Sequence, residues 1–311
     1  MKSHIVQITS DSAGQRLDNF LVKWWKGVPK SRIYRAVRAG EVRVNSGRVK
    51  VEYRLSEGDQ VRLPPLRVAT REAGDAPSEG LQAFLETRIL QETPDFLLIN
   101  KPMGMPVHGG TGLKGGLIEA IRMMRPSTSF LELVHRLDKD TSGCLLLAKK
   151  RKTLLYFHEQ FVHKRIQKRY IALVKGAWLG PETQRILLPL RKAAAPNGER
   201  HVVVDQEAGK ASETVVRVLR RFRATTCVEV SPVTGRTHQI RVHLSAIGHP
   251  IVGDTRYGDA DFNQVMRVQG LRRLFLHAAS LQSRGQDPDW PVWAICAPLD
   301  EEWRQAVARM V

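Results

Sequence analysis

The chain has 311 residues, 42% of them hydrophobic and 26% charged, which is the composition of a globular protein of about two domains. No apolar run approaches the ~20 residues of a membrane-spanning helix, the first residues lack the apolar stretch of a signal peptide, and the 3 cysteines are too far apart for a disulfide framework or a zinc site. The formal net charge of +18 favours nucleic acid as a partner over an anionic membrane surface, so we expect a cytoplasmic, nucleic-acid-binding protein with reduced cysteines.

Residues 1–63 predict a small module of two helices followed by a sheet. In "GQRLDNFLVKWWKG" apolar residues recur with the spacing of one helical face: Leu17, Phe20, Leu21 and Trp24. "PKSRIYRAVRAGE" predicts a second helix with Ser31 as its N-cap, an inner face of Ile33 and Val37, and Gly40 at its end. The segments "EVRVN", "RVKVEYRL" and "DQVRL" predict three strands joined by two turns.

Basic residues are concentrated in this module. Residues 1–70 hold 14 Lys and Arg against 6 Asp and Glu, a net charge of +8. A solvated basic surface is the simple interpretation, but the one-sided excess favours RNA or DNA binding through the backbone, because no RNP-type aromatic motif or zinc-finger spacing is present. The candidate residues for this contact are Arg16, Lys30, Ser31, Arg32, Arg35, Arg38 and Arg43.

Residues 64–82, rich in Pro, Gly, Ala and acidic residues, predict a linker to one long domain over residues 83–311. In that domain we expect helices at 153–164 and 237–248, and strands at 95–102, 132–137, 143–149, 168–176, 215–222 and 224–231. In the second helix Ile240, Leu244 and Ile247 are expected to face inward. The pattern has no regular βαβ alternation and no GxGxxG or Walker sequence, so a nucleotide cofactor is not expected. The fold class that fits best is α+β, with a mixed, mainly antiparallel sheet.

The stretch "LVHRLDKDTSGCLLLAKK", residues 133–150, places polar residues between two apolar runs. A tight hairpin tip would explain Asp, Thr, Ser and Gly at such a place. However, a plain turn needs neither His135 nor Arg136, and the flanking runs are apolar enough to anchor the loop in a core. We therefore interpret Asp138 as a candidate catalytic carboxylate.

Other kinds of site have less support. A metal site would combine His135, Asp138 and Asp140 with His238 and His243, but the last two are five residues apart and do not share a helix face. No nucleophile-elbow sequence supports a Ser-His-Asp triad, and no second acidic motif supports a retaining glycosidase. No metal is therefore expected.

A single carboxylate among basic residues suits nucleophilic attack at a sugar or base carbon. An arginine facing it would keep the carboxylate ionised and oriented. The segment "GRTHQIRVH" offers Arg236 and Arg241 for this task, although either could equally be a surface or phosphate-binding residue.

Taken together, "HRLDKDTSG" and "GRTHQIRVH" resemble the motifs of the RluA-type family of pseudouridine synthases. The segments "LLINKPMGMPVHGG", "QKRYIALVKG" and "RLFLHAASL" resemble further motifs of that family, and the N-terminal segment resembles its S4-like RNA-binding module. "GVPKSRIYRAVRAGEVRVN" and "PPLRVA" are most similar to the RluC-type enzymes, which act on large-subunit ribosomal RNA. The resemblance covers nearly the whole chain apart from the linker; Cys144 departs from it, since the family commonly has Leu or Val there.

The resemblance implies a role for individual residues. Asp138 matches the catalytic aspartate, Tyr170 the tyrosine that stacks on the target base, and Arg241 the arginine that pairs with the aspartate. Arg136 resembles the residue that fills the stack left by the flipped nucleotide. The remaining residues expected to contact substrate are His135, Leu276 and Arg236.

The resemblance implies that the protein isomerises specific uridines of 23S rRNA to pseudouridine, without a cofactor and as a monomer not bound to membranes. Two alternatives remain open, namely action on tRNA and a non-catalytic, ribosome-associated RNA-binding protein. Retention of Asp138, Tyr170 and Arg241 together argues against a non-catalytic protein, and the S4-like module argues against tRNA.

Overall fold

The computed structural model describes residues 3–25, 28–65, 77–109, 115–194, 200–283 and 293–310. Most of the predicted linker, residues 66–76, lies outside the described residues. None of the helices that the structure describes is long and apolar enough to span a bilayer.

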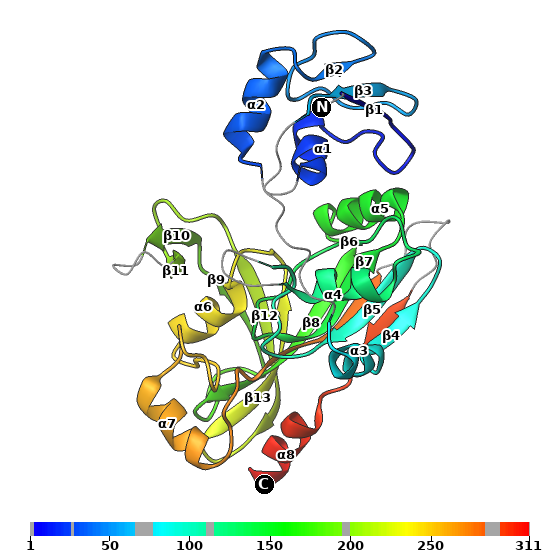
Figure 1. Ribbon diagram of the computed structural model, residues 1–311. Helices are drawn as coiled ribbons and strands as arrows, with labels where there is room; N and C mark the ends of the chain where they lie inside the picture. The colour runs from blue at the N-terminus through cyan, green and yellow to red at the C-terminus, as the bar shows by residue number, and fades with distance from the viewer. Residues whose placement is uncertain are drawn as a thin grey trace.

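The N-terminal module has an apolar core of its own and lies at one end of the molecule (Figure 1). Two helices and a small antiparallel sheet with the strand order β1-β3-β2 enclose this core. The elements are β1 (His4–Gln7), α1 (Leu17–Trp24), α2 (Lys30–Arg38), β2 (Arg43–Val44) and β3 (Gln60–Leu63). The predicted order of two helices before a sheet therefore needs one addition, because β1 precedes both helices and pairs with β3.

Two details of the predicted helices are wrong. Trp24, predicted on the inner face of α1, is 48% exposed, whereas Trp25 is 4% exposed. The reason is that the helix ends at Trp24, and Trp25 turns inward with φ −96° and ψ 67°. Ser31 lies inside α2 rather than capping it, since the helix begins at Lys30 directly after Pro29.

Residues 48–55, predicted as a strand, form none in the structure. Their carbonyl groups instead receive hydrogen bonds from the beginning of α1. The amides of Leu17 and Asp18 donate to the carbonyl oxygens of Tyr53 and Val51 at 2.7 and 3.0 Å. Because the first amides of a helix have no partner within it, this segment serves as a backbone cap for α1.

Among the described residues, polar contacts join the module to the larger domain. Lys23 Nζ lies 2.5 Å from Glu132 Oε1, and Arg151 Nε donates to the carbonyl oxygen of Ala13 at 2.5 Å. Residues 79–82, at the end of the predicted linker, belong instead to helix α3 (Glu79–Glu86). That helix begins there because the Ser78 hydroxyl accepts a hydrogen bond from the Leu81 amide and Leu85 is buried.

A large twisted sheet forms the centre of the second domain (Figure 1). Its strand order is β4-β5-β7-β14-β8-β13-β12-β9, with β6 added beside β7 and β15 beside β14. The strands are β4 (Ile89–Glu92), β5 (Phe96–Lys101), β6 (Glu132–Leu133), β7 (Ser142–Ala148), β8 (Ile166–Lys175), β9 (Thr183–Leu187), β12 (Glu213–Arg221), β13 (Thr225–Pro232), β14 (Leu276–Ser283) and β15 (Ala294–Cys296). The α+β class with a mainly antiparallel sheet is confirmed.

The helices and one further hairpin surround this sheet. The hairpin consists of β10 and β11, which form a separate two-stranded sheet. These elements are α4 (Leu117–Met124), α5 (Arg151–Val162), β10 (Leu190–Ala194), β11 (Arg200–Val204), α6 (Gln239–Ala246), α7 (Ala260–Val268) and α8 (Glu301–Arg309).

Strand β14 joins the two halves of the sheet, because it lies between β7 and β8. Among the strand pairs that the structure describes, β7 and β14 are the parallel one. Gly143 permits their close approach: its φ is +112°, and a Cβ atom there would lie 2.2 Å from the Ala278 carbonyl oxygen.

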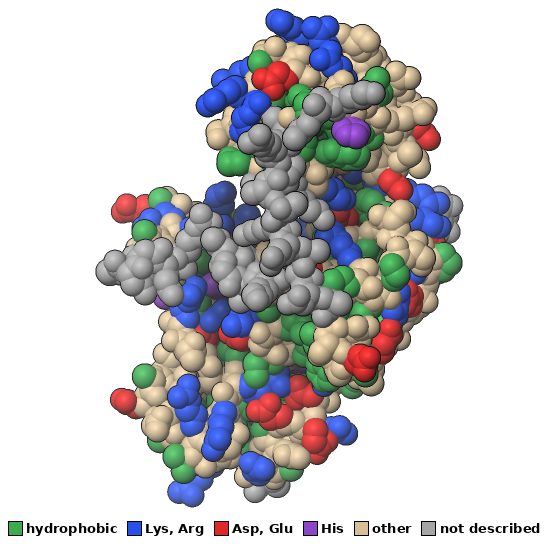
Figure 2. Space-filling model, in the orientation of Figure 1, with side chains coloured by type: hydrophobic (Ala, Val, Ile, Leu, Met, Phe, Trp, Pro, Cys, Tyr) green, Lys and Arg blue, Asp and Glu red, His purple; other side chains and the backbone are tan. Residues whose placement is uncertain are grey.

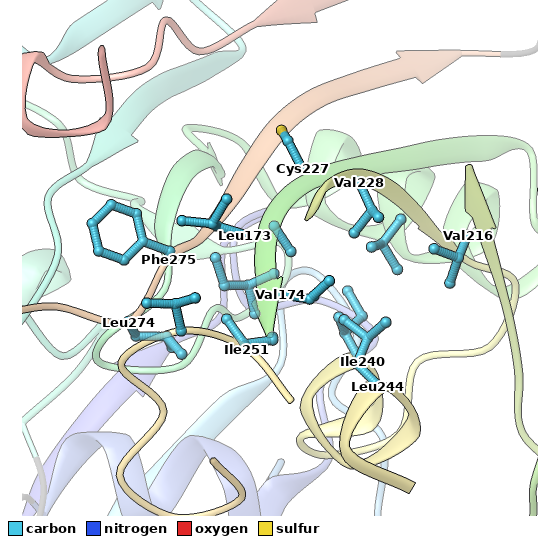
Figure 3. Close-up of a cluster of buried hydrophobic side chains, with 14 of the residues drawn as sticks. Leu173, Val174, Val216, Cys227, Val228, Ile240, Leu244, Ile251, Leu274 and Phe275 are labelled. Carbon is cyan, nitrogen blue, oxygen red and sulfur yellow. The ribbon is translucent and has the colours of Figure 1, made fainter. Parts of the chain in front are cut away.

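Helix α6 is fixed against the sheet by an apolar face. Figure 3 shows Ile240 and Leu244 of this helix beside strand residues that include Val174, within a cluster of buried side chains. Both helix residues are buried, as their spacing predicted. The helix therefore has a fixed rotation about its axis, which determines where its polar residues point.

Candidate active site

The loop that carries Asp138 joins β6 to β7 and is anchored in the core. Val134 and Leu137 are buried, and the Thr141 amide donates to the Asp138 carbonyl oxygen at 3.2 Å. The Asp138 side chain is 32% exposed. The structure thus presents the Asp138 carboxylate to solvent from a loop whose backbone is held from both sides, rather than from a free hairpin tip.

Lys101, at the end of β5, binds the backbone of the same loop. Its fully buried ammonium group donates to the carbonyl oxygens of Pro102, Met105 and Lys139, each at 2.8 Å. Burial lowers the pKa of Lys101 to about 7, and neighbouring carboxylates act in the opposite direction. Because Lys139 directly follows Asp138, these hydrogen bonds fix the backbone next to the carboxylate.

Arg241, on α6, places its guanidinium between two carboxylates. Nη1 lies 3.3 Å from Asp138 Oδ2, while Nε and Nη2 donate to Asp254 at 2.7 and 2.8 Å. Burial disfavours the Arg241 charge, but the hydrogen bonds and charge of Asp254, and then the charge of Asp138, raise its pKa above the usual value. Asp254 also accepts the amides of Arg256 and Tyr257 at 2.9 and 3.0 Å, so the whole group is rigid.

His238 immediately precedes α6 and has left-handed backbone geometry, with φ +52° and ψ 18°. Its Nδ1 lies 2.8 Å from the Tyr257 hydroxyl, and its Nε2 lies 3.8 Å from Asp138 Oδ2. The Tyr257 ring also stacks on the Arg241 guanidinium, with 5.1 Å between the Arg241 Cζ and the ring centroid. Unusual backbone conformations of this kind often occur at functional sites.

Tyr170 reaches the same site from β8. Its backbone is paired with Ala278 of β14 and Val230 of β13, and its side chain packs between two clusters of the apolar core. Burial raises the pKa of Tyr170, and the nearby charge of Asp138 raises it further, so the phenol stays protonated. The structure therefore brings the three predicted catalytic residues together, from a loop, a helix and a strand.

His135, expected to contact substrate, is instead hydrogen-bonded to the sheet. Its Nε2 accepts the Leu146 amide at 3.1 Å, and its ring lies against Phe161 with centroids 5.4 Å apart. Burial lowers the pKa of His135 to about 3, so the imidazole is neutral. Strand β6 ends at Leu133, short of the strand predicted for residues 132–137, because this side chain takes the place of a backbone acceptor.

The other predicted substrate residues occupy different environments. Arg136 is exposed beside Asp138, whereas Leu276 is 3% exposed within the core at the start of β14. The exposed Arg236 donates to the Ala211 carbonyl oxygen at 3.4 Å. Of the two arginines in "GRTHQIRVH", the partner of Asp138 is therefore Arg241.

The metal hypothesis finds no geometric support in the part of the chain that the structure describes. No group of three or more His, Cys, Asp or Glu residues there could hold a metal ion. His243 is fully buried, and its two ring nitrogens bond to the Thr214 hydroxyl and the Leu188 carbonyl oxygen at 2.9 Å each. His238 and His243 thus point in different directions, as their spacing predicted.

Sequence reasoning missed Asp254, Tyr257 and Lys168. Asp254 begins a turn in "GDTRYGD", where Asp is a common residue type, so no sequence signal distinguishes it. Lys168 could have been found by alternation, because it precedes Tyr170 by two positions on β8. Its ammonium lies 5.6 Å from the Phe161 ring centroid, burial lowers its pKa, and no carboxylate of the described residues pairs with it.

The candidate RNA-binding residues of the N-terminal module fall into two groups. Lys30, Ser31, Arg35 and Arg38 are exposed on α2, and Figure 2 shows Lys and Arg side chains gathered on that side of the module. The other three arginines have partners within the module. Arg16 pairs with Asp18 at 2.8 Å, Arg32 with Glu41 at 3.0 Å, and Arg43 donates to the Gly40 and Ser46 carbonyl oxygens at 3.3 Å.

Comparison with known proteins relates both parts of the chain to described families. Residues 95–246 match the family described as RNA pseudouridylate synthase, and residues 15–61 match the S4 domain. The ribosomal large subunit pseudouridine synthase C of Escherichia coli (strain K12) is 52% identical over 98% of this chain and 96% of its own length. The protein of the same name from Salmonella typhimurium is 55% identical over 97% and 95% of the two chains.

A solved structure shares the fold of the larger domain. That of Human RNA Pseudouridylate Synthase Domain Containing 4 superposes with a TM-score of 0.59 at 25% identity, covering 74% of this chain and 95% of that one.

Proposed function

The chain belongs to the RNA pseudouridylate synthase family, and on that premise we propose that Asp138, Arg241 and Tyr170 convert uridines of large-subunit ribosomal RNA to pseudouridine. The protein is an isomerase with an S4 RNA-binding domain. Its relatives that match over nearly their whole length are named for the large ribosomal subunit, which supports 23S rRNA as the substrate.

The observation that carries the proposal is the position of Arg241 between Asp254 and Asp138. A guanidinium held by a buried carboxylate orients the Asp138 carboxylate as a nucleophile. The reaction breaks the C1′–N1 bond of the uridine, turns the detached uracil, and forms the C1′–C5 bond. The C5 proton leaves to solvent and N1 takes up a proton, so the reaction needs neither an electron acceptor nor an external group.

The neighbouring residues admit and hold the flipped nucleotide. A base in a helix must leave the stack before chemistry, which costs a few kcal/mol. We assign Arg136, exposed beside Asp138, to fill the place that the flipped nucleotide leaves in the base stack. Tyr170 stacks on the flipped uracil. Leu276 contributes to the apolar wall beneath it, and Arg236 contacts the RNA backbone. His135 acts through its hydrogen bond to β7 and supports the loop without touching substrate.

The exposed cations of α2 supply the longer-range RNA contact, which agrees with the net charge of +18. We propose that the protein works as a monomer in the cytoplasm, away from membranes. That Asp138, Arg241 and Tyr170 all come from one chain supports a monomer.

Tritium release from large-subunit rRNA containing 5-tritiated uridine tests this function, because isomerisation frees the hydrogen at C5. We expect release by the wild type and by Asp140→Asn, which removes a neighbouring carboxylate, and no release by Asp138→Asn. RNA affinity of Asp138→Asn should stay within a few-fold of the wild type. Full activity of Asp138→Asn would refute the catalytic assignment, and release from tRNA alone would refute the substrate.

A further inference from the structure

His238 presents a ring nitrogen to the active site that no described residue binds. Its Nε2 lies 3.8 Å from Asp138 Oδ2, which is too long for a hydrogen bond, and no nearer acceptor is present in the described ranges. The side chain is only 15% exposed, so this nitrogen is largely shielded from bulk water. It therefore has an unused hydrogen-bonding position next to the reacting carboxylate.

The partners of Tyr257 favour the tautomer of His238 that carries its proton on Nε2. The Tyr257 hydroxyl accepts the Val202 amide at 3.1 Å and lies 2.8 Å from His238 Nδ1. The hydroxyl has one proton to donate, and among the described residues His238 Nδ1 is its acceptor. Nδ1 is then the acceptor, and Nε2 of the neutral imidazole carries the hydrogen that points toward Asp138.

The charged groups around His238 leave the imidazole neutral. Burial lowers the pKa of His238, the charge of Asp138 acts against this, and Arg241 and Arg256 lower the pKa again. Asp254 raises the pKa of His238, with the smallest effect of these groups. At neutral pH the residue is thus a neutral donor.

The local backbone is held so that the imidazole keeps this direction. His238 has left-handed geometry, which most side chains adopt only under constraint. The constraint comes from Gln239, whose Oε1 accepts the Arg236 amide at 3.0 Å and whose Nε2 donates to the Glu213 carbonyl oxygen at 2.8 Å. A fixed donor of this kind is preorganised for a ligand.

We propose that His238 is a further substrate-contacting residue, whose Nε2–H donates a hydrogen bond to a carbonyl oxygen of the target uracil. This inference rests on the proposed function. When the C1′–N1 bond breaks, its electron pair stays with the base and is shared by the O2 and O4 carbonyl oxygens. A preorganised donor next to that charge lowers the barrier, and loss of one such donor typically reduces kcat about 10²–10³-fold.

Two substitutions separate this role from a structural one. His238→Asn suits the left-handed backbone and can accept the Tyr257 hydroxyl at the position of Nδ1, but it lacks the Nε2 donor. His238→Gln places an amide donor close to the position of Nε2, although Gln is less suited to that backbone. A structural role therefore predicts that Asn is the better replacement, and a donor role predicts that Gln is.

The experiment measures single-turnover tritium release and RNA affinity for the wild type and both variants. We expect His238→Asn to lose about 10²-fold in rate with RNA affinity within about two-fold, and His238→Gln to recover at least about ten-fold of that loss. Wild-type rates for His238→Asn, or equal loss in both variants, would overturn the inference. A wild-type enzyme that releases no tritium from large-subunit rRNA would instead overturn the proposed function.

A direct measurement addresses the tautomer. In 15N-histidine spectra, assigned by the loss of one residue's signals in His238→Asn, His238 should show a protonated Nε2 and an unprotonated Nδ1 at neutral pH. A protonated Nδ1 with a bare Nε2 would overturn the inference, because the imidazole would then have no donor facing the uracil.

Discussion

Asp254 binds the guanidinium of Arg241 through two hydrogen bonds, of 2.7 and 2.8 Å, and leaves Nη1 to face Asp138. Asp254 is 2% exposed, and it accepts two backbone amides in addition to these bonds. Asp254, which does not face the substrate, therefore fixes the orientation of the Arg241 guanidinium.

Removing Asp254 should affect both stability and activity. In Asp254→Ala the buried Arg241 loses its bidentate partner, and breaking a buried ion pair in this way costs about 3–5 kcal/mol. Urea unfolding measures this loss, and tritium release should fall with it, since Nη1 no longer has a fixed position. The matched control is Glu182→Ala, which removes an exposed partner of Arg221 and should change stability by less than about 1 kcal/mol. Equal effects of the two substitutions would contradict this account of Arg241.

Lys101 should be indispensable to the shape of the Asp138 loop. Lys101→Met keeps most of the volume but leaves three carbonyl groups without their donor, which we expect to reduce the free energy of unfolding by about 3 kcal/mol. The rate of isomerisation should fall further than RNA affinity, since Lys139 adjoins Asp138. Lys139→Met, at an exposed neighbouring position, should change stability by no more than about 0.5 kcal/mol. A Lys101→Met enzyme with normal turnover would show that the loop needs no such support.

His135 should make the protein sensitive to acid. Its pKa is about 3 in the folded protein and 6.5 for an ordinary imidazole, so between these values the unfolded chain binds a proton that the folded chain does not. Stability supplied by neutral His135 is therefore present above pH 6.5 and is lost as the pH falls toward 3, by up to about 4 kcal/mol.

His135→Gln isolates this contribution, because Gln can accept the Leu146 amide but does not titrate. Unfolding free energies measured from pH 7 to pH 4 should decline less steeply in the variant than in the wild type. His243 and His277, whose pKa values burial also lowers, are present in both proteins and drop out of the comparison. Parallel pH profiles would contradict the assignment.

The exposed cations of α2 should determine how RNA affinity depends on salt. Replacing Lys30, Arg35 and Arg38 by Gln should weaken RNA binding and reduce the slope of log affinity against log salt by about 2 to 3, because fewer counterions are released. The control changes the same charge on α7 and α8, which lie at the far end of the molecule from the N-terminal module (Figure 1): Arg267, Arg304 and Arg309. An equal change of slope in both triple variants would mean that α2 has no special part in the contact.

Lys168 should bind a phosphate group of the target strand, because its ammonium has no carboxylate partner among the described residues. Lys168→Met should raise KM several-fold while kcat changes little, whereas Lys164→Met, at an exposed position just before β8, should alter neither. A fall in kcat at constant KM would place Lys168 in the chemical step instead.

The sequence predicted the structure best where a spacing of residue types is compatible with only one kind of surroundings. The spacing of Ile240 and Leu244 predicted both α6 and its inner face, and polar residues between two apolar runs drew attention to Asp138. The requirement for a cation opposite that carboxylate left Arg236 and Arg241 equally eligible, and only the resemblance to the family singled out Arg241. The structure separates the two because the apolar face of α6 fixes the rotation of the helix.

The incorrect predictions result from contacts between separate segments of the chain, which no local sequence pattern reveals. Residues 48–55 alternate like a strand, but their carbonyl groups are taken by the first amides of α1. His135 was noted because a plain turn needs no histidine, yet its ring replaces a backbone acceptor of the sheet. Asp254 and Tyr257 come from a turn that reaches Arg241 only once α6 has packed on the sheet.

The position of β14 makes the active site depend on contacts between segments far apart in the sequence. Asp138 belongs to the half of the sheet before β14 in the strand order, and Tyr170 to the half after it, yet β14 is residues 276–283 of 311. The two halves of the sheet can therefore join only after β14 has entered between β7 and β8. Assembly of the catalytic centre thus requires contacts of high sequence separation, which form more slowly than local ones.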